Sequence, residues 1–169
     1  MKYENGMIEL IKMNFTESIQ DIYLKATYPL LNTLRKVVVE VHHIGSSTFS
    51  TEFNTIDILF VCKKSTDIYD YQEILIADGY TPSKEKSPFF RNLLILTKEI
   101  DQVITQYVFI SENDVRVKEI LDLSNVMKKS KVLQDELISL KLESASDYID
   151  RKFKFYNDVK DIMLKGTVL

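Results

Sequence analysis

The stretch that decides the fold is VVVEVHHIGSST (residues 37–48), followed by TIDILFVC (residues 55–62). The first segment is a β-branched run ending at Gly45, which is typical of a strand followed by a tight turn. The second is an apolar run interrupted by one acidic residue, Asp57. An unpaired carboxylate buried in an apolar strand costs about 2–5 kcal/mol, so we expect Asp57 to face a polar cleft or to have a partner. The two segments therefore predict neighbouring strands that bring a Gly-Ser turn close to a carboxylate.

Helical patterns flank this pair of strands. Apolar residues at helical spacing predict a helix over Thr16–Arg35, with cap chemistry at residues 16–18 and a kink or break at Pro29. A second helix is predicted over Asp67–Asp78, and Gly79 ends it as a C-cap glycine does. The strand pair is thus expected to lie between two helices in the chain.

The second half of the chain begins with strands and ends with helices. Apolar runs predict strands at Phe89–Thr97 and Val103–Ile110, and the polar step Lys98–Asp101 between them is short enough for a hairpin. Helices follow from Asp114 onward, the last over Tyr148–Leu164. This order predicts an α+β fold in one domain over residues 1–169, with a small mixed β-sheet, flanking helices and a helical C-terminal half.

Composition excludes several classes of protein. The chain has 169 residues, 45% apolar and 28% charged, which does not fit a disordered, collagen-like or disulfide-rich chain. The net charge of −3 speaks against a DNA-coating protein, and no apolar run is long enough to span a membrane. The lone Cys62 fits a reducing compartment, and Glu4 and Glu9 do not fit a signal peptide. We expect a cytoplasmic protein with neither DNA nor a membrane as partner.

The Gly-Ser turn carries the residue types that phosphate binding needs. Gly45 lets the backbone come close to a triphosphate, and the hydroxyls and N–H groups of Ser46 and Ser47 can hold phosphate oxygens. A carboxylate on the adjacent strand, here Asp57, is a ligand for Mg²⁺. Two structural interpretations stay open: Gly45-Ser46 as a simple strand-ending turn, and Asp57 as a structural pairing.

This block resembles the GrpB-like family. HIGSST (residues 43–48) and IDIL (residues 56–59) are similar to that family's HIGSTS segment and PIIDILV strand. The segment FFR (residues 89–91), the Leu140-Lys141 pair and the Tyr156–Lys160 pair follow in the same order as its other motifs. The resemblance implies the nucleotidyltransferase fold and the transfer of a nucleotidyl group from a nucleoside triphosphate, with Mg²⁺ as cofactor, to an unknown acceptor.

The resemblance also implies roles for individual residues. Asp57 would be the catalytic residue and metal ligand, and Gly45, Ser46 and Ser47 would hold the β- and γ-phosphates. Arg91 would neutralise developing charge, although pairing with an acid at the end of the sheet is an equal alternative. Four further residues are expected around the cleft: His43, Asp101, Gln106 and Lys141.

The chain departs from the family at places that matter for catalysis. Its loop between Gly45 and Asp57 is about two residues shorter. Where the family has His-x-His, this chain has Gln106-Tyr107-Val108, or Thr105 and Tyr107 if the register slips by one. Nucleotidyltransferases commonly carry a D-x-D pair, but Thr55 and Leu59 flank Asp57 at that spacing, which leaves Asp101 as the nearby candidate for a second acid. Two hypotheses therefore stay open: a Mg²⁺-dependent nucleotidyltransferase, and a non-catalytic module of the same fold that binds a nucleotide, a phosphorylated small molecule or a partner.

Strand alternation predicts which way the remaining polar groups point. Asp57 should share its face with Thr55 and Leu59, while Ile56, Ile58 and Phe60 point to the helices. His43 should share a face with Val37, Val39 and Val41, and a hydrogen-bonded, half-buried role is favoured there over metal binding. His42 points the other way, and Cys62 is expected in the core.

Overall fold

The computed structural model of the protein describes residues 11–14, 20–51, 54–83, 90–143 and 146–166. In these parts of the chain, six strands form one mixed sheet in the order β1-β2-β3-β6-β5-β4. The strands are β1 (Lys12–Asn14), β2 (Val38–Ile44), β3 (Thr55–Cys62), β4 (Thr81–Pro82), β5 (Leu94–Ile100) and β6 (Val103–Ser111). The α+β class predicted from the sequence is confirmed.

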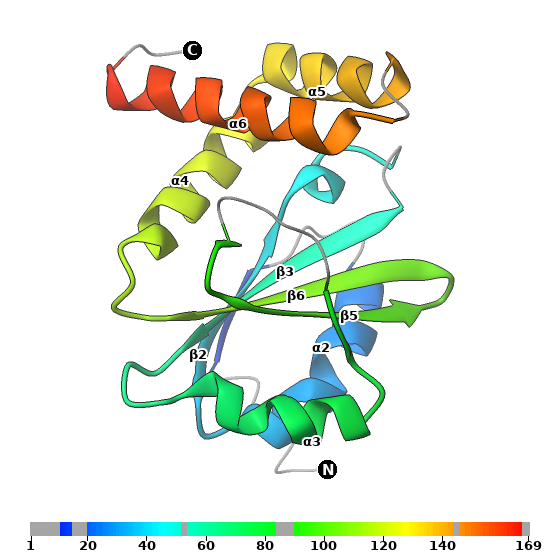
Figure 1. The fold of residues 1–169 in the computed structure, drawn as a ribbon, viewed down its shortest axis with the longest axis vertical. Helices are drawn as coiled ribbons and strands as arrows, with labels where there is room; N and C mark the ends of the chain where they lie inside the picture. The colour runs from blue at the N-terminus through cyan, green and yellow to red at the C-terminus, as the bar shows by residue number, and fades with distance from the viewer. Residues whose placement is uncertain (1–10, 15–19, 52–53, 84–89, 144–145, 167–169) are drawn as a thin grey trace.

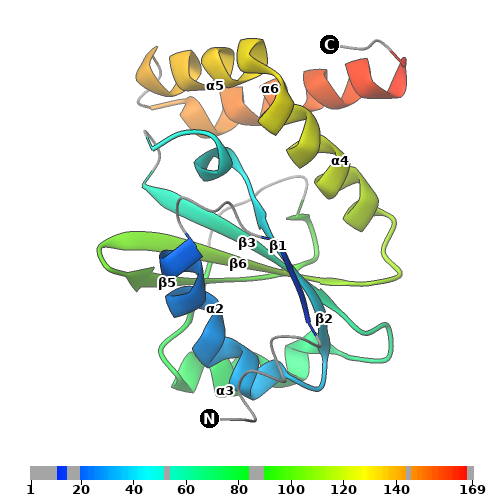
Figure 2. The same cartoon turned by 180° about the vertical axis from the view of Figure 1, so that it is seen from behind.

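Helices cover both faces of the sheet (Figures 1 and 2). Two of them, α2 (Gln20–Leu34) and α3 (Gln72–Ala77), lie on one face, and α3 follows the short 3₁₀ helix η3 (Ile68–Tyr71). On the other face α4 (Arg116–Lys129) leads to α5 (Lys131–Glu143) and α6 (Tyr148–Leu164), which pack against each other above the sheet.

The side chains of β3 divide between two cores, as their alternation predicts. Ile56, Ile58 and Phe60 belong to the cluster that contains the buried residues of α2 and α3. Leu59 and Val61 belong to a second cluster, with Ile120 of α4. A residue of β3 therefore faces α2 and α3 or the C-terminal helices according to its place in the period-two alternation.

Strand register fixes what lies beside Asp57. β3 runs antiparallel to β2, with Ile44 opposite Asp57, and parallel to β6, with Gln106 beside Asp57. The end of β2 and the start of β3 therefore meet at one edge of the sheet. The 3₁₀ helix η2 (Ser46–Thr48) leaves β2 at this edge and lies beneath α5 and α6 (Figure 1).

Helix boundaries agree with the sequence patterns in part. The last helix spans Tyr148–Leu164, as predicted. The helix predicted over Thr16–Arg35 is observed as α2, and its proposed cap at residues 16–18 lies outside the described residues. The expected break at Pro29 is wrong, because α2 continues through this residue as one helix. The segment predicted as one helix over Asp67–Asp78 is split between η3 and α3.

The hairpin of β5 and β6 is shifted from its predicted position. Phe89 lies outside the described residues, and β5 starts at Leu94 because Asn92 has a φ of 60°, which extended backbone does not allow. Strand β5 continues to Ile100, and the turn falls at Asp101-Gln102, whose φ angles of 51° and 67° match a two-residue hairpin loop. The polar residues Lys98 and Glu99, predicted as the connection, are therefore part of the strand.

A register shift in β2 changes one predicted face. The pairing with β3 is irregular between Val38 and Glu40, and Val39 packs against the second cluster instead of joining Val37 and Val41. A bulge of this kind inserts one residue and reverses the alternation before it. The short strands β1 and β4 carry too few residues for a periodic signal and were not predicted.

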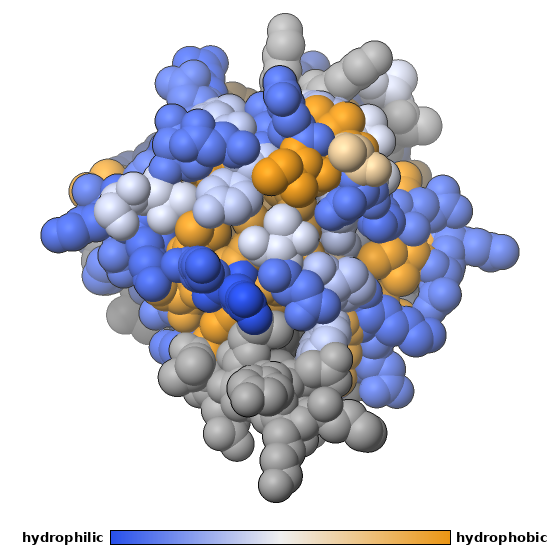
Figure 3. Space-filling view, turned by 90° about the horizontal axis from the view of Figure 1, so that it is seen from below, coloured by the Kyte–Doolittle hydropathy of each residue, from blue (hydrophilic) through white to orange (hydrophobic). Residues whose placement is uncertain are grey.

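The described helices include none that is both long and apolar enough to cross a membrane. Apolar side chains are nevertheless exposed at the end of the molecule formed by η3 and α3, where Tyr69, Ile74 and Ile76 are 42–50% exposed. Seen from below, apolar patches lie among hydrophilic side chains (Figure 3).

Candidate functional site

Gly45 and Asp57 are packed together at the edge where β2 ends and β3 begins. Gly45 has a φ of 78° and a ψ of −171°, a backbone conformation available almost only to glycine. A Cβ added here would overlap the Asp57 carboxylate and would lie 3.1 Å from its Cγ. Both the backbone conformation and the close approach therefore require glycine, and they bring the half-buried carboxylate beside the start of η2.

A chain of hydrogen bonds runs from this loop to α2. His43 Nε2 lies 2.8 Å from Ser47 Oγ, which is 3.4 Å from the Tyr23 hydroxyl. The rings of Tyr23 and His43 are in contact, with centroids 4.1 Å apart. Burial and then the nearby charge of Lys128 lower the pKa of His43 to about 3. His43 is therefore a neutral ring at physiological pH; it is hydrogen-bonded to Ser47, as predicted, but at 1% exposure it is buried and not half-buried.

Two more polar residues lie at the same edge. Ser46 is 1% exposed, and its Oγ has no hydrogen-bond partner in the structure. Gln106, 7% exposed, occupies the position of β6 that is in register with Asp57. Buried polar atoms are nearly always hydrogen-bonded, so the Ser46 hydroxyl is an exception at this edge of the sheet.

The C-terminal helices bring two side chains to this edge. Lys128 of α4 donates from Nζ to the carbonyl of His43 at 3.4 Å, and partial burial lowers the pKa of its ammonium group. Tyr156 of α6 interacts with the Asp57 charge, which adds to burial in raising the pKa of its hydroxyl. Phe49, which directly follows η2, packs against the cluster of buried residues from α4, α5 and α6. The helical layer therefore covers the loop, with a phenol close to the Asp57 carboxylate and a cation at the His43 carbonyl.

The donor set does not fit a metal centre built from protein side chains. Within the described ranges, no group of three His, Cys, Asp or Glu side chains could hold a metal ion. The strand neighbours of Asp57 explain this, because Ile44 and Gln106 stand beside it in register and Thr55 and Leu59 flank it along the strand. Mg²⁺ prefers several oxygen ligands, and Asp57 contributes the carboxylate of a single side chain.

The structure places two of the predicted site residues elsewhere. Leu94, the first residue of β5, is in register with Phe60 of β3 through the strand β6 between them. Phe60 is three residues, or about 10 Å, beyond Asp57 along β3. Arg91 comes before Leu94 in the chain and so lies still farther along. Arg91 is exposed at that far end, where its carbonyl accepts a hydrogen bond from Arg116. Asp101 pairs with Lys25 of α2 at 3.0 Å. Neither residue is brought to Asp57.

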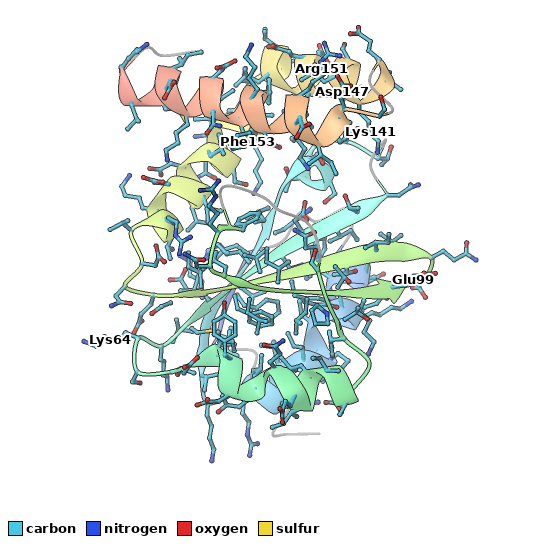
Figure 4. The ribbon with its side chains drawn as sticks, in the orientation of Figure 1. Lys64, Glu99, Lys141, Asp147, Arg151 and Phe153 are labelled. Atoms are coloured by element: carbon cyan, nitrogen blue, oxygen red, sulfur yellow. The ribbon has the colours of Figure 1, made fainter. Side chains whose placement is uncertain are left out.

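Lys141 is half-buried in the last turn of α5. In the view of Figure 4 it lies between the helical layer and the tip of β3. Together, His43, Gly45, Ser46, Ser47, Asp57 and Gln106 form one polar edge, which we call the Gly45–Asp57 site.

The sequence model of the GrpB protein family matches residues 15–168. The chain belongs to the GrpB family. Its fold is similar to the crystal structure of the conserved protein GrpB from Enterococcus faecalis, with a TM-score of 0.64 and 16% sequence identity over 89% of this chain and 97% of that one. No curated protein matches the sequence. Membership in the GrpB family confirms the predicted resemblance and places the chain in a nucleotidyltransferase-like superfamily.

In this GrpB protein, three residues at the site were not predicted as site residues. Tyr23 lies within the helix predicted over Thr16–Arg35, and Lys128 lies within the helices predicted from Asp114 onward. Tyr156 was singled out by the family pattern, without a position relative to Asp57. No local pattern could have found Lys128, because its contact with His43 joins residues 85 positions apart.

Proposed function

We propose that this protein binds a nucleotide, through its phosphate groups, at the Gly45–Asp57 site. The observation that carries the proposal is the Ser46 hydroxyl, which is buried without a partner on the loop that begins at Gly45. A hydroxyl of this kind is satisfied when it donates a hydrogen bond to a phosphate oxygen. Lys128 supports the assignment, because its ammonium lies at the same edge and offsets the repulsion between Asp57 and a phosphate.

Mg²⁺ enters this proposal only as a partner of the nucleotide. Since Asp57 provides the carboxylate of one side chain, the remaining oxygen ligands would have to come from the nucleotide's phosphates and from water. Binding without Mg²⁺, through Ser46, Ser47 and Lys128, is the other form of the same proposal. The two forms differ in whether Asp57 strengthens or weakens nucleotide binding, which makes that residue the one to test.

Transfer of a nucleotidyl group to an acceptor is a second candidate function. Membership in a nucleotidyltransferase-like superfamily favours it, and the position of Asp57 beside the Gly-Ser loop is compatible with it. The lack of a second carboxylate in register with Asp57 favours binding alone. We therefore place nucleotide binding first and nucleotidyl transfer second.

Thermal shift measurements test the binding proposal. The protein is heated with ATP, GTP, CTP or UTP, each with and without Mg²⁺, and the Tm is compared with that of the free protein. We expect at least one nucleotide to raise the Tm and Ser46→Ala to reduce that shift. Asp101→Asn is the matched control, because its carboxylate pairs with Lys25 and lies away from Asp57. If no nucleotide raises the Tm under either condition, the proposal is wrong.

The same variants separate binding from transfer. If Asp57→Asn abolishes a Mg²⁺-dependent shift and also abolishes pyrophosphate release from the bound nucleotide, nucleotidyl transfer is supported. If Asp57→Asn leaves the shift unchanged or increases it, and no pyrophosphate is released, the protein binds without transfer. Asp101→Asn should behave like the natural protein in both assays.

A further inference from the structure

A cavity lies at the opposite end of the sheet from the Gly45–Asp57 site. It has a volume of about 500 Å³ and lies where β3 and β6 end, bounded by the loop after β3, the segment before β5 and the loop that leads to α4. Cys62 is the last residue of β3 and Ser111 is the last residue of β6. Asp57 and Gln106 lie near the starts of the same strands. We call it the β3–β6 cavity.

The topology of the sheet explains why a cavity forms there. β3 and β6 are adjacent and parallel. After β3 the chain turns toward η3 and α3 on one face, and after β6 it turns toward α4 on the other. Where neighbouring parallel strands send their connections to opposite faces, a crevice opens at their carboxyl ends, and this is where open α/β sheets bind ligands.

The lining joins an apolar floor to a polar rim. Ile68 and Leu93, both half-buried, supply its accessible apolar surface, and Cys62 and Phe109 lie buried behind them. Hydroxyl and amide side chains surround the opening: Ser65, Thr66, Asn92 and Ser111. This combination is typical of a site for a small organic molecule, with a surface for its apolar body and a few polar groups that orient it.

Charged groups at the rim indicate the polar part of the ligand. Both oxygens of Asp114 accept hydrogen bonds from Arg116, whose Nη1 also donates to the carbonyl of Arg91. Asp67 accepts from the backbone N–H of Tyr69. Lys64 is directed away from the sheet into solvent (Figure 4), so its ammonium group is not part of the lining chemistry. Asp114 is thus neutralised by Arg116, whereas Asp67 keeps its charge at the exposed part of the rim, and the cationic donors are those of Arg116.

Arg116 still has hydrogen-bond donors to offer. A guanidinium group carries five N–H bonds, and the bonds to Asp114 and Arg91 use one on each of its three nitrogens. One N–H therefore remains on each terminal nitrogen. Asp114 holds the group in a fixed orientation, and a guanidinium held in this way is suited to receive a carboxylate.

We propose that the β3–β6 cavity binds a small organic carboxylate with a compact apolar body. The carboxylate would accept hydrogen bonds from Arg116 at the rim, and the apolar body would cover Ile68 and Leu93. This site is independent of the nucleotide site proposed above, because it lies at the other end of the strands and shares no residue with it.

Amide NMR titration of the whole chain tests the proposal with three probes. Benzoate has both features of the proposed ligand, benzyl alcohol has the apolar body without the charge, and inorganic phosphate has the charge without the body. We expect benzoate to shift the amide resonances of Thr66, Asn92 and Arg116 saturably, with an affinity at least tenfold higher than that of benzyl alcohol. Over the same concentrations, inorganic phosphate should produce no saturable change in the chemical shifts of these amides.

A filled cavity provides the matched variant. Ser65→Trp places a large side chain at the opening from an exposed position, and it should weaken benzoate binding at least tenfold. Lys63→Trp changes an exposed neighbour that does not line the cavity and should leave the affinity unchanged. The amide resonances of Gly45 and Ser46 report that both variants are folded and should not move with benzoate.

Three outcomes would overturn the inference. The first is the absence of a saturable shift with benzoate. The second is equal affinity for one of the other probes. Equal affinity for benzyl alcohol would show that the carboxylate is not recognised, and equal affinity for phosphate would show that the apolar body is not recognised. The third is unchanged benzoate binding in Ser65→Trp, which would place the ligand elsewhere on the protein.

Discussion

The carboxylate of Asp57 fills the space beside Gly45 that a side chain at residue 45 would need. The contact joins the end of β2 to the start of β3, and the register of the two strands places Ile44 directly opposite Asp57. The backbone of Gly45 adopts a φ of 78° at the same point. Two separate constraints, one on backbone conformation and one on space, therefore act on a single residue of the candidate site.

Gly45→Ala should destabilise the protein by about 2–4 kcal/mol, because a positive φ in this region strains any residue with a Cβ and the new methyl group must displace Asp57. Urea denaturation measures the loss. Gly79→Ala is the matched control: it also has a positive φ, of 92°, but the nearest heavy atom to its Cβ is the mobile end of Lys98 at 3.9 Å. Equal losses in the two variants would show that the contact with Asp57 contributes nothing.

Protein stability should fall in acid partly because of His43. Its pKa is about 3 in the folded protein and about 6.5 when unfolded, so below pH 6.5 the unfolded state binds a proton that the folded state does not. The free energy of unfolding then decreases by up to about 1.4 kcal/mol per pH unit from this residue, between pH 6.5 and pH 3. Denaturation curves at pH 7, 6, 5 and 4 should therefore show a shallower pH dependence for His43→Asn. Parallel curves for the two proteins would contradict this prediction.

Lys128→Gln should weaken nucleotide binding by about five- to thirtyfold, since one charge at a partly exposed phosphate site contributes about 1–2 kcal/mol. The remaining affinity should depend less on salt concentration. Lys129→Gln is the control, because it removes the neighbouring charge from an exposed position. Isothermal titration at two ionic strengths gives both quantities. If the two variants lose affinity equally, the effect is one of net charge and not of Lys128.

Tyr107→Phe should cost about 1–2 kcal/mol of stability. The hydroxyl of Tyr107, a fully buried residue of β6, donates to the carbonyl of Ala26 in α2 at 2.9 Å, and its removal deletes this buried hydrogen bond between the sheet and the helix. Tyr69→Phe, at a residue that is 48% exposed, should change stability by less than about 0.5 kcal/mol. Thermal or urea denaturation of both variants checks the difference.

The sequence patterns predicted the elements that form the site better than those that surround it. β3 spans Thr55–Cys62 as predicted, because eight residues of alternating and apolar character give a clear signal. β5 was misplaced because its apolar run includes residues before Asn92, whose positive φ no periodicity reveals. The bulge in β2 likewise moved Val39 to the other face, although the run 37–44 reads as one regular strand.

The predicted site residues also differ in how well the sequence located them. Gly45, Ser46 and Asp57 were predicted from a turn and a strand that are close in the chain, and the structure brings them together. Arg91 was assigned from the family's FFR motif and Asp101 as the nearby acid at the mouth of the strand pair, and register places Arg91 before the start of β5 while Asp101 pairs with Lys25. The order of motifs along the chain does not reveal at which end of the sheet the side chains of each motif lie.

By itself, the sequence determined the class of the fold, the strand pair that ends in Gly45 and carries Asp57, and the limits of the last helix. These features depend on side-chain spacing and backbone preference within one or two elements, which local periodicity records. Only the tertiary structure decided that Lys128 and Tyr156 reach the site, and that a cavity opens at the other end of β3 and β6. Those contacts depend on strand register and on which face each helix covers, and both are set by packing between residues far apart in the chain.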